Sequence, residues 1–207
     1  MARKFQITGA SSLTSGARPH AFRVRTLSPL LAICPLLLLA ACQDRNASAS
    51  NELPAPDEAA IARLAPASGS EVSGEVRFYP DGDNVIVTVE AEGLETGMHG
   101  FHIHETGDCS APDASSAGGH YAPQGHPHGS PTMEQQHHVG DMGNIRADGN
   151  GVAMVQLSLD TLSLDNPDSI IGKAVIIHAQ ADDLQTQPSG DSGDRLACGV
   201  IQAPVST

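Results

Sequence analysis

Six histidines and one aspartate in the central part of the chain are candidate metal ligands. An imidazole nitrogen or a carboxylate oxygen can each donate a lone pair to a metal ion. The seven residues are His102, His104, His120, His128, His138, Asp141 and His178. No other group of residues in the chain indicates a specific chemistry as clearly.

His102 and His104 lie two residues apart in an alternating run that predicts a β-strand. Side chains two apart on a strand point to the same face, so the two imidazoles project together. His99 falls on the opposite side with Phe101 and Ile103, and we expect it to be packed and hydrogen-bonded rather than a ligand. Two neutral nitrogen donors suit copper or zinc better than magnesium or calcium. Taken alone, the pair is equally compatible with two solvated histidines.

The other five candidates lie on loops and at a strand end. Four of them belong to the segments 119–129 and 137–141, whose glycines and prolines predict loops. A long loop in a compact domain is uncommon unless it is disordered or functional, and metal binding would order it. His178 follows the apolar run 174–177, which predicts a strand that carries it out of the core.

The number of candidates is itself informative. Two four-coordinate metal ions need eight ligand positions, and seven residues fill them if one imidazole, deprotonated at both nitrogens, bridges the ions. A set of four histidines suits copper, and a set of three histidines and one aspartate suits zinc.

Six segments that contain or flank these residues resemble the copper-zinc superoxide dismutases, and specifically their bacterial exported branch. The matching segments are residues 97–105, 107–109, 118–121, 138–144, 175–179 and 195–199. The resemblance runs from about residue 74 to residue 202. It implies an all-β, antiparallel Greek-key sandwich or barrel that dismutates superoxide to dioxygen and hydrogen peroxide, with one copper and one zinc ion per subunit.

The resemblance also assigns roles to the candidate ligands. It implies that copper is bound by His102, His104, His120 and His178. It implies that zinc is bound by His120, His128, His138 and Asp141. His120 is then the bridge, and in the family's scheme it leaves the reduced copper, takes up a proton and returns it to peroxide. Asp182 matches a carboxylate that joins the copper ligand His102 to the zinc ligand His128 and fixes both rings.

Two further histidines, His126 and His137, stand beside the predicted zinc ligands. We prefer His128 because a glycine follows it, and His138 because it lies three residues before Asp141, as the family pattern requires. His126 and His137 are predicted to be solvated loop residues or a weak outer patch that captures metal.

Arg195 matches the family's substrate-guiding arginine, although a surface salt bridge is the alternative. Of the 11 basic residues in the chain, five precede Cys42, which leaves 6 basic against 24 acidic residues, a formal net charge of −18. Such a charge argues against nucleic acid as a partner and repels superoxide overall. We therefore expect a local positive potential at the copper site from Arg195, helped by Lys173.

Two cysteines, Cys109 and Cys198, lie in the body of the chain, and Cys34 and Cys42 lie near its amino terminus. An even pair in an exported domain predicts a disulfide rather than two buried thiols. The resemblance implies that this disulfide ties the metal-binding loop to the strand that follows Arg195.

The amino-terminal region is typical of an export signal. Basic residues precede the apolar run 30–41, which is too short to span a bilayer comfortably. The run ends in Leu-Ala-Ala followed by Cys42, which resembles the bacterial lipobox, and Gln43 favours outer-membrane sorting. We expect a signal peptide over residues 1–42 and a periplasmic protein anchored to the membrane by lipid on Cys42. A simple cleaved signal peptide is the alternative.

Residues 43–73 are rich in Ala, Ser, Asn and Pro, which predicts a flexible tether, with a short helix around residues 58–64. Residues 74–207 are predicted to form the catalytic domain, with about eight antiparallel strands. Alternating apolar residues predict strands over 76–78, 85–89 and 155–159. Two long functional loops are expected over 105–140 and 179–195.

Two other functions fit part of this pattern. A non-catalytic periplasmic protein that binds copper and zinc could use the same fold and histidines, but it would not need Arg195. A copper-only relative would lack His128, His138 and Asp141. The sequence does not decide between a monomer and a homodimer.

Overall fold

The computed structural model describes residues 59–133, 135–165 and 167–204. The proposed signal peptide, Cys42 and most of the predicted tether lie outside these residues. Within them the secondary structure is eight strands and a short 3₁₀ helix: β1 (Ala60–Pro66), β2 (Ser73–Asp81), β3 (Asn84–Glu92), β4 (Gly97–His104), η2 (Ser115–Ala117), β5 (Asp141–Ala147), β6 (Ala153–Leu159), β7 (Ala174–His178) and β8 (Arg195–Gln202). No helix in this part of the chain is long and apolar enough to cross a membrane.

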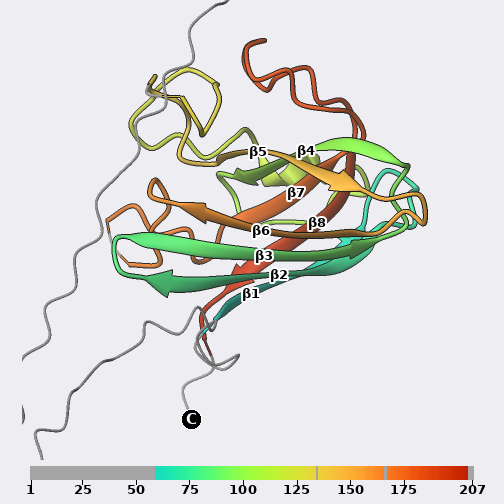
Figure 1. Cartoon of the computed structure of the whole chain (residues 1–207), viewed down its shortest axis with the longest axis horizontal. Coiled ribbons are helices and arrows are strands. Elements are labelled where there is room, and N and C mark those ends of the chain that lie inside the picture. Colours follow the sequence, from blue (N-terminus) through green and yellow to red (C-terminus); the bar gives the residue numbers. More distant parts are fainter. Residues whose placement is uncertain (1–58, 134, 166, 205–207) are drawn as a thin grey trace, which may run out of the picture. The chain divides into compact units, whose positions relative to one another are not determined.

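The strands form a nearly closed antiparallel barrel (Figure 1). Their order is β5-β4-β7-β8-β1-β2-β3-β6, and the two end strands, β5 and β6, lie against each other. Consecutive strands β3 and β4 are not neighbours, and neither are β6 and β7, so these connections cross the barrel in the Greek-key manner. The predicted all-β fold class is confirmed.

The strands form where apolar and polar residues alternate. In β3, Val85, Val87 and Val89 are buried and the residues between them are only partly buried, as a pleated strand over a core requires. The core is built mainly from Val, Leu, Ile and Ala side chains, with Phe78 and Phe101 among the largest fully buried ones. The three runs predicted from alternation lie in β2, β3 and β6.

The prediction for residues 58–64 was wrong. Residues 60–66 form β1, which pairs with both β2 and β8; for example, Ala62 faces Val76 on one side and Ile201 on the other. The alanines favour a helix locally, but burial between two strands overrides that preference. The folded part therefore begins at or before residue 60, so the tether cannot extend to residue 73.

Strands β4 and β7 carry candidate metal ligands on the face away from the barrel core. Phe101 and Ile103 of β4 pack into the core, whereas His102 and His104 lie on the other face, beneath the loops. The two long loops follow these strands, over residues 105–140 and 179–194, close to the predicted limits. The barrel thus supplies a rigid wall and the loops cover it.

Candidate metal centre

Backbone hydrogen bonds bring the three histidine-bearing segments together. The N–H of Ile103 donates to the carbonyl of Gly140, and the N–H of Tyr121 donates to the carbonyl of Ile103, both at 2.8 Å. The N–H of Gly140 donates to the carbonyl of Tyr121 at 2.9 Å, which closes a ring of three bonds. Each of these residues is a sequence neighbour of a candidate ligand, so the ring places those ligands side by side.

The first cluster consists of four buried imidazoles whose nearest nitrogens all lie within 4.8 Å of one another. They are His102, His104, His120 and His178. Two ring nitrogens, Nδ1 of His102 and Nε2 of His120, are buried without a hydrogen-bond partner. A buried nitrogen without a partner is costly, and a metal ion would satisfy it. Four convergent imidazoles fit copper.

In His104 and His178, the ring nitrogen that points away from the cluster is held by a hydrogen bond. Nδ1–H of His104 donates to the carbonyl of Gly118 at 2.9 Å, and Nδ1–H of His178 donates to that of Gly193 at 3.2 Å. A backbone carbonyl can only accept, so each ring keeps a lone pair on Nε2, and these two Nε2 atoms are 3.4 Å apart. Outer hydrogen bonds of this kind fix the tautomer and direction of metal-binding histidines.

The second cluster is built around the fully buried carboxylate of Asp141. The Nδ1 atoms of His120, His128 and His138 lie 2.8, 2.9 and 3.2 Å from its Oδ1 atom. Its Oδ2 atom accepts the backbone N–H groups of Gly129 and His138. Three nitrogens and one carboxylate oxygen form a donor set suited to tetrahedral zinc. His120 belongs to both clusters through its two different nitrogens.

Asp182 joins the two clusters from behind. Its Oδ2 atom accepts Nε2–H of His102 at 2.8 Å, and its Oδ1 atom accepts Nε2–H of His128 at 2.9 Å. Asn144 holds Asp182 by two hydrogen bonds, from Asp182 N to Asn144 Oδ1 and from Asn144 Nδ2 to Asp182 O. Sequence reasoning gave Asn144 no role, because its contact lies 38 residues away along the chain.

Burial and mutual repulsion keep three imidazoles of the first cluster neutral, those of His104, His120 and His178. Burial lowers the pKa of His104 to about 2 and that of His178 to about 3. The pKa of His120 falls to about 4, again mainly through burial, although its hydrogen bond to Asp141 opposes the shift. Neutral imidazoles have the lone pairs that a metal needs.

His128 and the two carboxylates behave differently. Burial lowers the pKa of His128, but its hydrogen bonds to Asp141 and Asp182 together raise it to about 9. Burial raises the pKa values of Asp141 and Asp182, yet hydrogen bonds from the histidines bring both well below the ordinary value. Both carboxylates are therefore anionic at neutral pH and able to balance a metal's charge.

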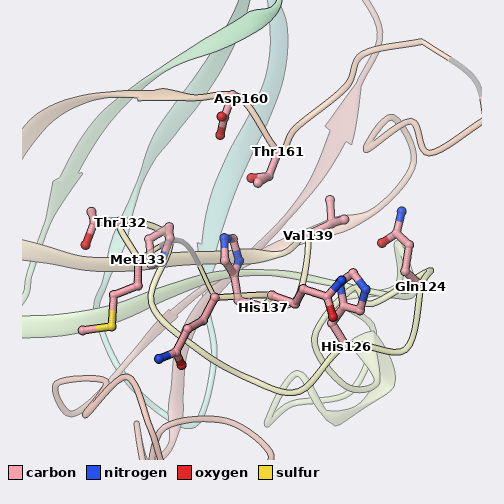
Figure 2. Close-up of a pocket in the computed structure, with 11 residues that line it drawn as sticks. Gln124, His126, Thr132, Met133, His137, Val139, Asp160 and Thr161 are labelled. Carbon is pink, nitrogen blue, oxygen red and sulfur yellow. The ribbon is translucent and has the colours of Figure 1, made fainter.

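His126 and His137 lie outside both clusters. They line a separate hollow of about 630 Å³ (Figure 2). Nδ1 of His138 reaches Asp141, whereas Nδ1–H of the adjacent His137 donates to the backbone carbonyl of His138. The structure thus places His128 and His138, rather than their neighbours, beside Asp141.

A cavity of about 330 Å³ opens onto the first cluster. Its lining includes His104, His120 and His178, together with Arg195 at the side. Lys173 is not one of its lining residues; its ammonium group donates to the carbonyl of Glu105 and lies 4.6 Å from the ring centre of Tyr121. Of the two basic residues expected to act locally, only Arg195 faces this cavity.

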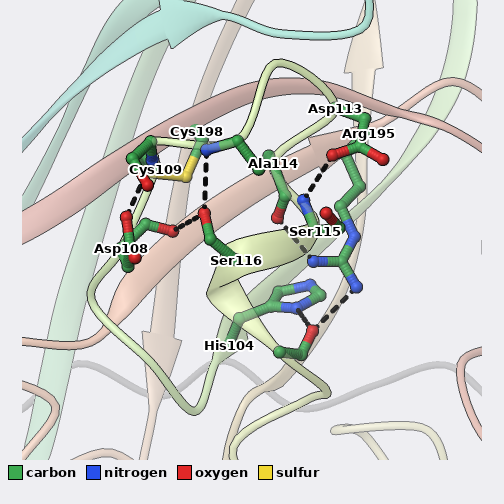
Figure 3. The surroundings of a disulfide bond; sticks show 12 residues. His104, Asp108, Cys109, Asp113, Ala114, Ser115, Ser116, Arg195 and Cys198 are labelled. Carbon is green, nitrogen blue, oxygen red and sulfur yellow. Dashed lines mark hydrogen bonds between the residues drawn. A yellow bond between two sulfur atoms is a disulfide. The ribbon is translucent and has the colours of Figure 1, made fainter.

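Arg195 is anchored through the loop that the disulfide holds (Figure 3). Its guanidinium donates to the carbonyls of Ala114 and Gly118, each at 2.7 Å. Burial lowers the pKa of Arg195, but an arginine keeps its charge at neutral pH. Both hydrogen bonds go to backbone carbonyls, so the predicted alternative of a surface salt bridge does not describe this residue.

The predicted disulfide is present between Cys109 and Cys198, whose Cα atoms lie 5.8 Å apart. It joins the loop after β4 to β8 across 89 positions in the sequence. Closing a loop of this length stabilises the folded state by roughly 4 to 5 kcal/mol in the chain-entropy model. Ser116 adds a hydrogen bond to the carbonyl of Asp108, so the segment beside Arg195 is tied at several points.

Comparison with known proteins places this site in a family. Residues 72–201 match the family model described as copper/zinc superoxide dismutase. The chain belongs to the copper/zinc superoxide dismutase family. Superoxide dismutase [Cu-Zn] of Onchocerca volvulus is 40% identical over 144 residues, covering 64% of this chain and 90% of the relative. Extracellular superoxide dismutase [Cu-Zn] of Brugia pahangi is 38% identical over 151 residues, covering 69% and 74%.

Gly190 provides a test of the carboxylate that joins the clusters. A Cβ atom there would overlap Asp182 Oδ1 and lie 2.7 Å from His128 Nε2. We expect Gly190→Ala to weaken zinc binding by about 10- to 100-fold, the usual effect of disturbing such outer contacts. The measurement is zinc content after dialysis against graded chelator.

Gly69→Ala is the matched control for this substitution. Gly69 has a similar φ, +73° against +68°, but open space where the Cβ would lie. It suffers the same backbone strain without the clash. Equal zinc loss in the two variants would show that strain, rather than displacement of Asp182, is responsible.

The lowered histidine pKa values predict how the metal-free protein responds to acid. The pKa values of His104, His120 and His178 lie below the unfolded value of 6.5, so below that pH the unfolded chain binds more protons. The free energy of unfolding should therefore fall from pH 6.5 towards 4, by up to about 1.4 kcal/mol per pH unit for each histidine.

His128 contributes in the opposite direction and in a different range. Its raised pKa adds stability that is complete below pH 6.5 and lost as the pH rises towards 9. Urea denaturation of metal-free protein at several pH values in 0.15 M salt, which screens surface charges, measures both effects. If the free energy of unfolding stays constant or increases as the pH falls from 6.5 to 4, the prediction for His104, His120 and His178 is wrong.

Proposed function

We propose that this protein dismutates superoxide at a copper ion held by the first cluster, beside a zinc ion held by the second. The proposed copper ligands are His102, His104, His120 and His178. The proposed zinc ligands are His120, His128, His138 and Asp141. The observation that carries this proposal is the placement of His120, whose Nε2 faces one set of donors while its Nδ1 faces the other.

Bound copper would supply one-electron redox chemistry, so that one superoxide is oxidised to dioxygen and a second, with two protons, is reduced to hydrogen peroxide. The chain supplies the surroundings for this exchange. Asp182, Gly118 and Gly193 fix the rings of three copper ligands. A cavity lined by His104, His120 and His178 gives small molecules access to the cluster.

His120 is proposed to hold and deliver a proton. Its Nε2 atom is buried and has no hydrogen-bond partner among the described residues, and its ring lines the cavity. Its Nδ1 atom stays directed at Asp141, so a proton on Nε2 leaves the ring's orientation unchanged. A positioned imidazole of this kind can act as a general acid towards peroxide.

Arg195 is proposed to attract and orient the anion. It lines the same cavity, and its guanidinium is fixed by two backbone carbonyls. In a protein with a large negative charge, a fixed cation near the site gives an approaching monoanion a local favourable potential. A protein that only stored copper would need neither this cation nor an open cavity.

Metal exchange tests the proposed activity directly. Chelator-treated protein is expected to lose superoxide consumption, and copper with zinc should restore it, whereas zinc alone should not. Metal analysis of the active protein should give one copper and one zinc per chain. Full activity in protein free of copper would overturn the proposal.

The role of Arg195 is tested by charge reversal. We expect Arg195→Glu to lower kcat/KM for superoxide by at least about tenfold and to reduce its dependence on salt, because the local attraction is lost. Copper and zinc content should not change. Arg146→Glu is the matched control, because Arg146 is exposed on β5 and does not line the cavity. Equal losses in the two variants would indicate a general charge effect instead.

We also propose that the protein belongs to the exported bacterial branch of the family and is a periplasmic lipoprotein anchored through Cys42. The support is the apolar run 30–41 followed by Cys42, and the disulfide fits an oxidising compartment. The Brugia pahangi relative carries the name extracellular, which agrees with export in general.

Lipid attachment is tested with Cys42→Ser. In a bacterium that expresses the full chain, the unaltered protein is expected to fractionate with membranes and incorporate labelled palmitate. The variant should do neither. Release of the unaltered protein as a soluble periplasmic form without label would instead support a simple cleaved signal peptide.

A further inference from the structure

The backbone of His128 is held at two points by one side chain, that of Gln187. The N–H of His128 donates to Gln187 Oε1, and Gln187 Nε2 donates to the carbonyl of His128, each at 2.9 Å. The side-chain amide therefore pairs with this residue as a neighbouring strand of an antiparallel sheet would. The two residues lie 59 positions apart in the sequence, one on the loop after β4 and the other on the loop after β7.

The ring of His128 is held by the same loop. Its Nε2–H donates to Asp182 Oδ1 at 2.9 Å, and Asp182 lies five residues before Gln187. The segment between them is tied by local hydrogen bonds: Asp182 Oδ1 accepts the N–H of Leu184, and Asp183 Oδ1 accepts the N–H groups two and three residues further on. The loop after β7 thus fixes both the backbone and the side chain of His128.

These contacts also distinguish His128 from His126. Gln187 Oε1 accepts the N–H of His128, and the carboxylate at the centre of the second cluster accepts the N–H of the next residue, Gly129, at 2.9 Å. Pro127 stands between the two histidines and has no N–H. If His126 took the place of His128, Pro127 would take the place of Gly129, and the hydrogen bond to the carboxylate would be lost. The surroundings therefore select His128.

We propose that Gln187 is a positioning residue for the zinc site. Its amide fixes the backbone of His128 so that Nδ1 of the ring points into the second cluster, where this atom lies 2.9 Å from Asp141 Oδ1. The inference rests on the proposed function, because it takes His128 to be a zinc ligand. Gln187 is not a member of either cluster and acts only through His128.

The benefit of this contact is preorganisation. Between His120 and β5 the described residues form no helix or strand, so the regular hydrogen bonds of secondary structure do not fix the backbone at residue 128. Without the amide of Gln187, zinc would have to order this part of the loop when it binds. A ligand that is already held in place also swings away from the ion less often, so zinc dissociates more slowly.

The test compares Gln187→Met with the unaltered protein, both loaded with copper and zinc. Methionine keeps the length of the side chain, but its thioether cannot donate and accepts only weakly. We expect zinc to dissociate at least about tenfold faster from the variant in excess chelator, in line with the usual effect of losing an outer contact. Retention of copper over the same period verifies that the first cluster is intact.

Gln185→Met is the matched control. Gln185 is an exposed glutamine of the same loop, and among the described residues only its backbone forms hydrogen bonds. The same substitution there changes the composition of the loop equally and leaves His128 held. This variant should release zinc at the rate of the unaltered protein.

A double-variant cycle shows whether Gln187 acts through His128. His128→Ala removes the proposed ligand and should itself speed the loss of zinc. Adding Gln187→Met to this variant should cause no further acceleration, because residue 128 no longer binds the ion. A glutamine that only stabilised the loop would add its own effect in both backgrounds.

Two results would overturn this inference and leave the proposed function intact. They are equal rates of zinc dissociation from the Gln187 and Gln185 variants, and additive effects of Gln187→Met and His128→Ala. If the unaltered protein bound no zinc, both the inference and the proposed zinc site would be wrong. The zinc content of the unaltered protein therefore separates the two cases.

Discussion

The site depends on the cost of burying polar side chains beside a hydrophobic core. Six imidazoles and two carboxylates lie between the barrel wall and the loops, largely shielded from water. Each nitrogen and oxygen must find a partner there or lose hydration energy without compensation. Asp141 meets this demand because its Oδ1 atom lies beside three ring nitrogens and its Oδ2 atom accepts two backbone N–H groups. Asp182 meets it because its two oxygens accept from two different rings, those of His102 and His128. The two nitrogens left without partners face the first cluster, where a metal ion would satisfy them.

The rigidity of this arrangement comes from β4 and β7. Their inward side chains are anchored in the core, and the outward ones have little freedom to move. The loops add the remaining proposed ligands, and the loop after β4 is held by the ring of hydrogen bonds among Ile103, Tyr121 and Gly140. Ligands from distant segments therefore meet with little further loss of conformational entropy on metal binding.

Much of this could be predicted from sequence because the signals are local. Alternation identified β2, β3, β4 and β6, and several separate motifs in the right order identified the converging ligands. The limits of both loops agreed closely because His104, Asp141 and His178 stand at strand ends. β1 was missed because its alanines favour a helix until β2 and β8 flank it. Asn144 and Gly190 were missed because their importance arises only from contact with Asp182.

The carbonyl oxygen of Gly118 accepts two hydrogen bonds, one from a proposed copper ligand, His104, and one from Arg195. This one oxygen thus helps to position both the proposed copper ligand His104 and Arg195, the residue proposed to attract superoxide. A shift of this peptide would change the surroundings of the proposed copper ion and the attraction of superoxide by Arg195 together. Any substitution in the loop that moves this carbonyl would therefore act on His104 and Arg195 at the same time.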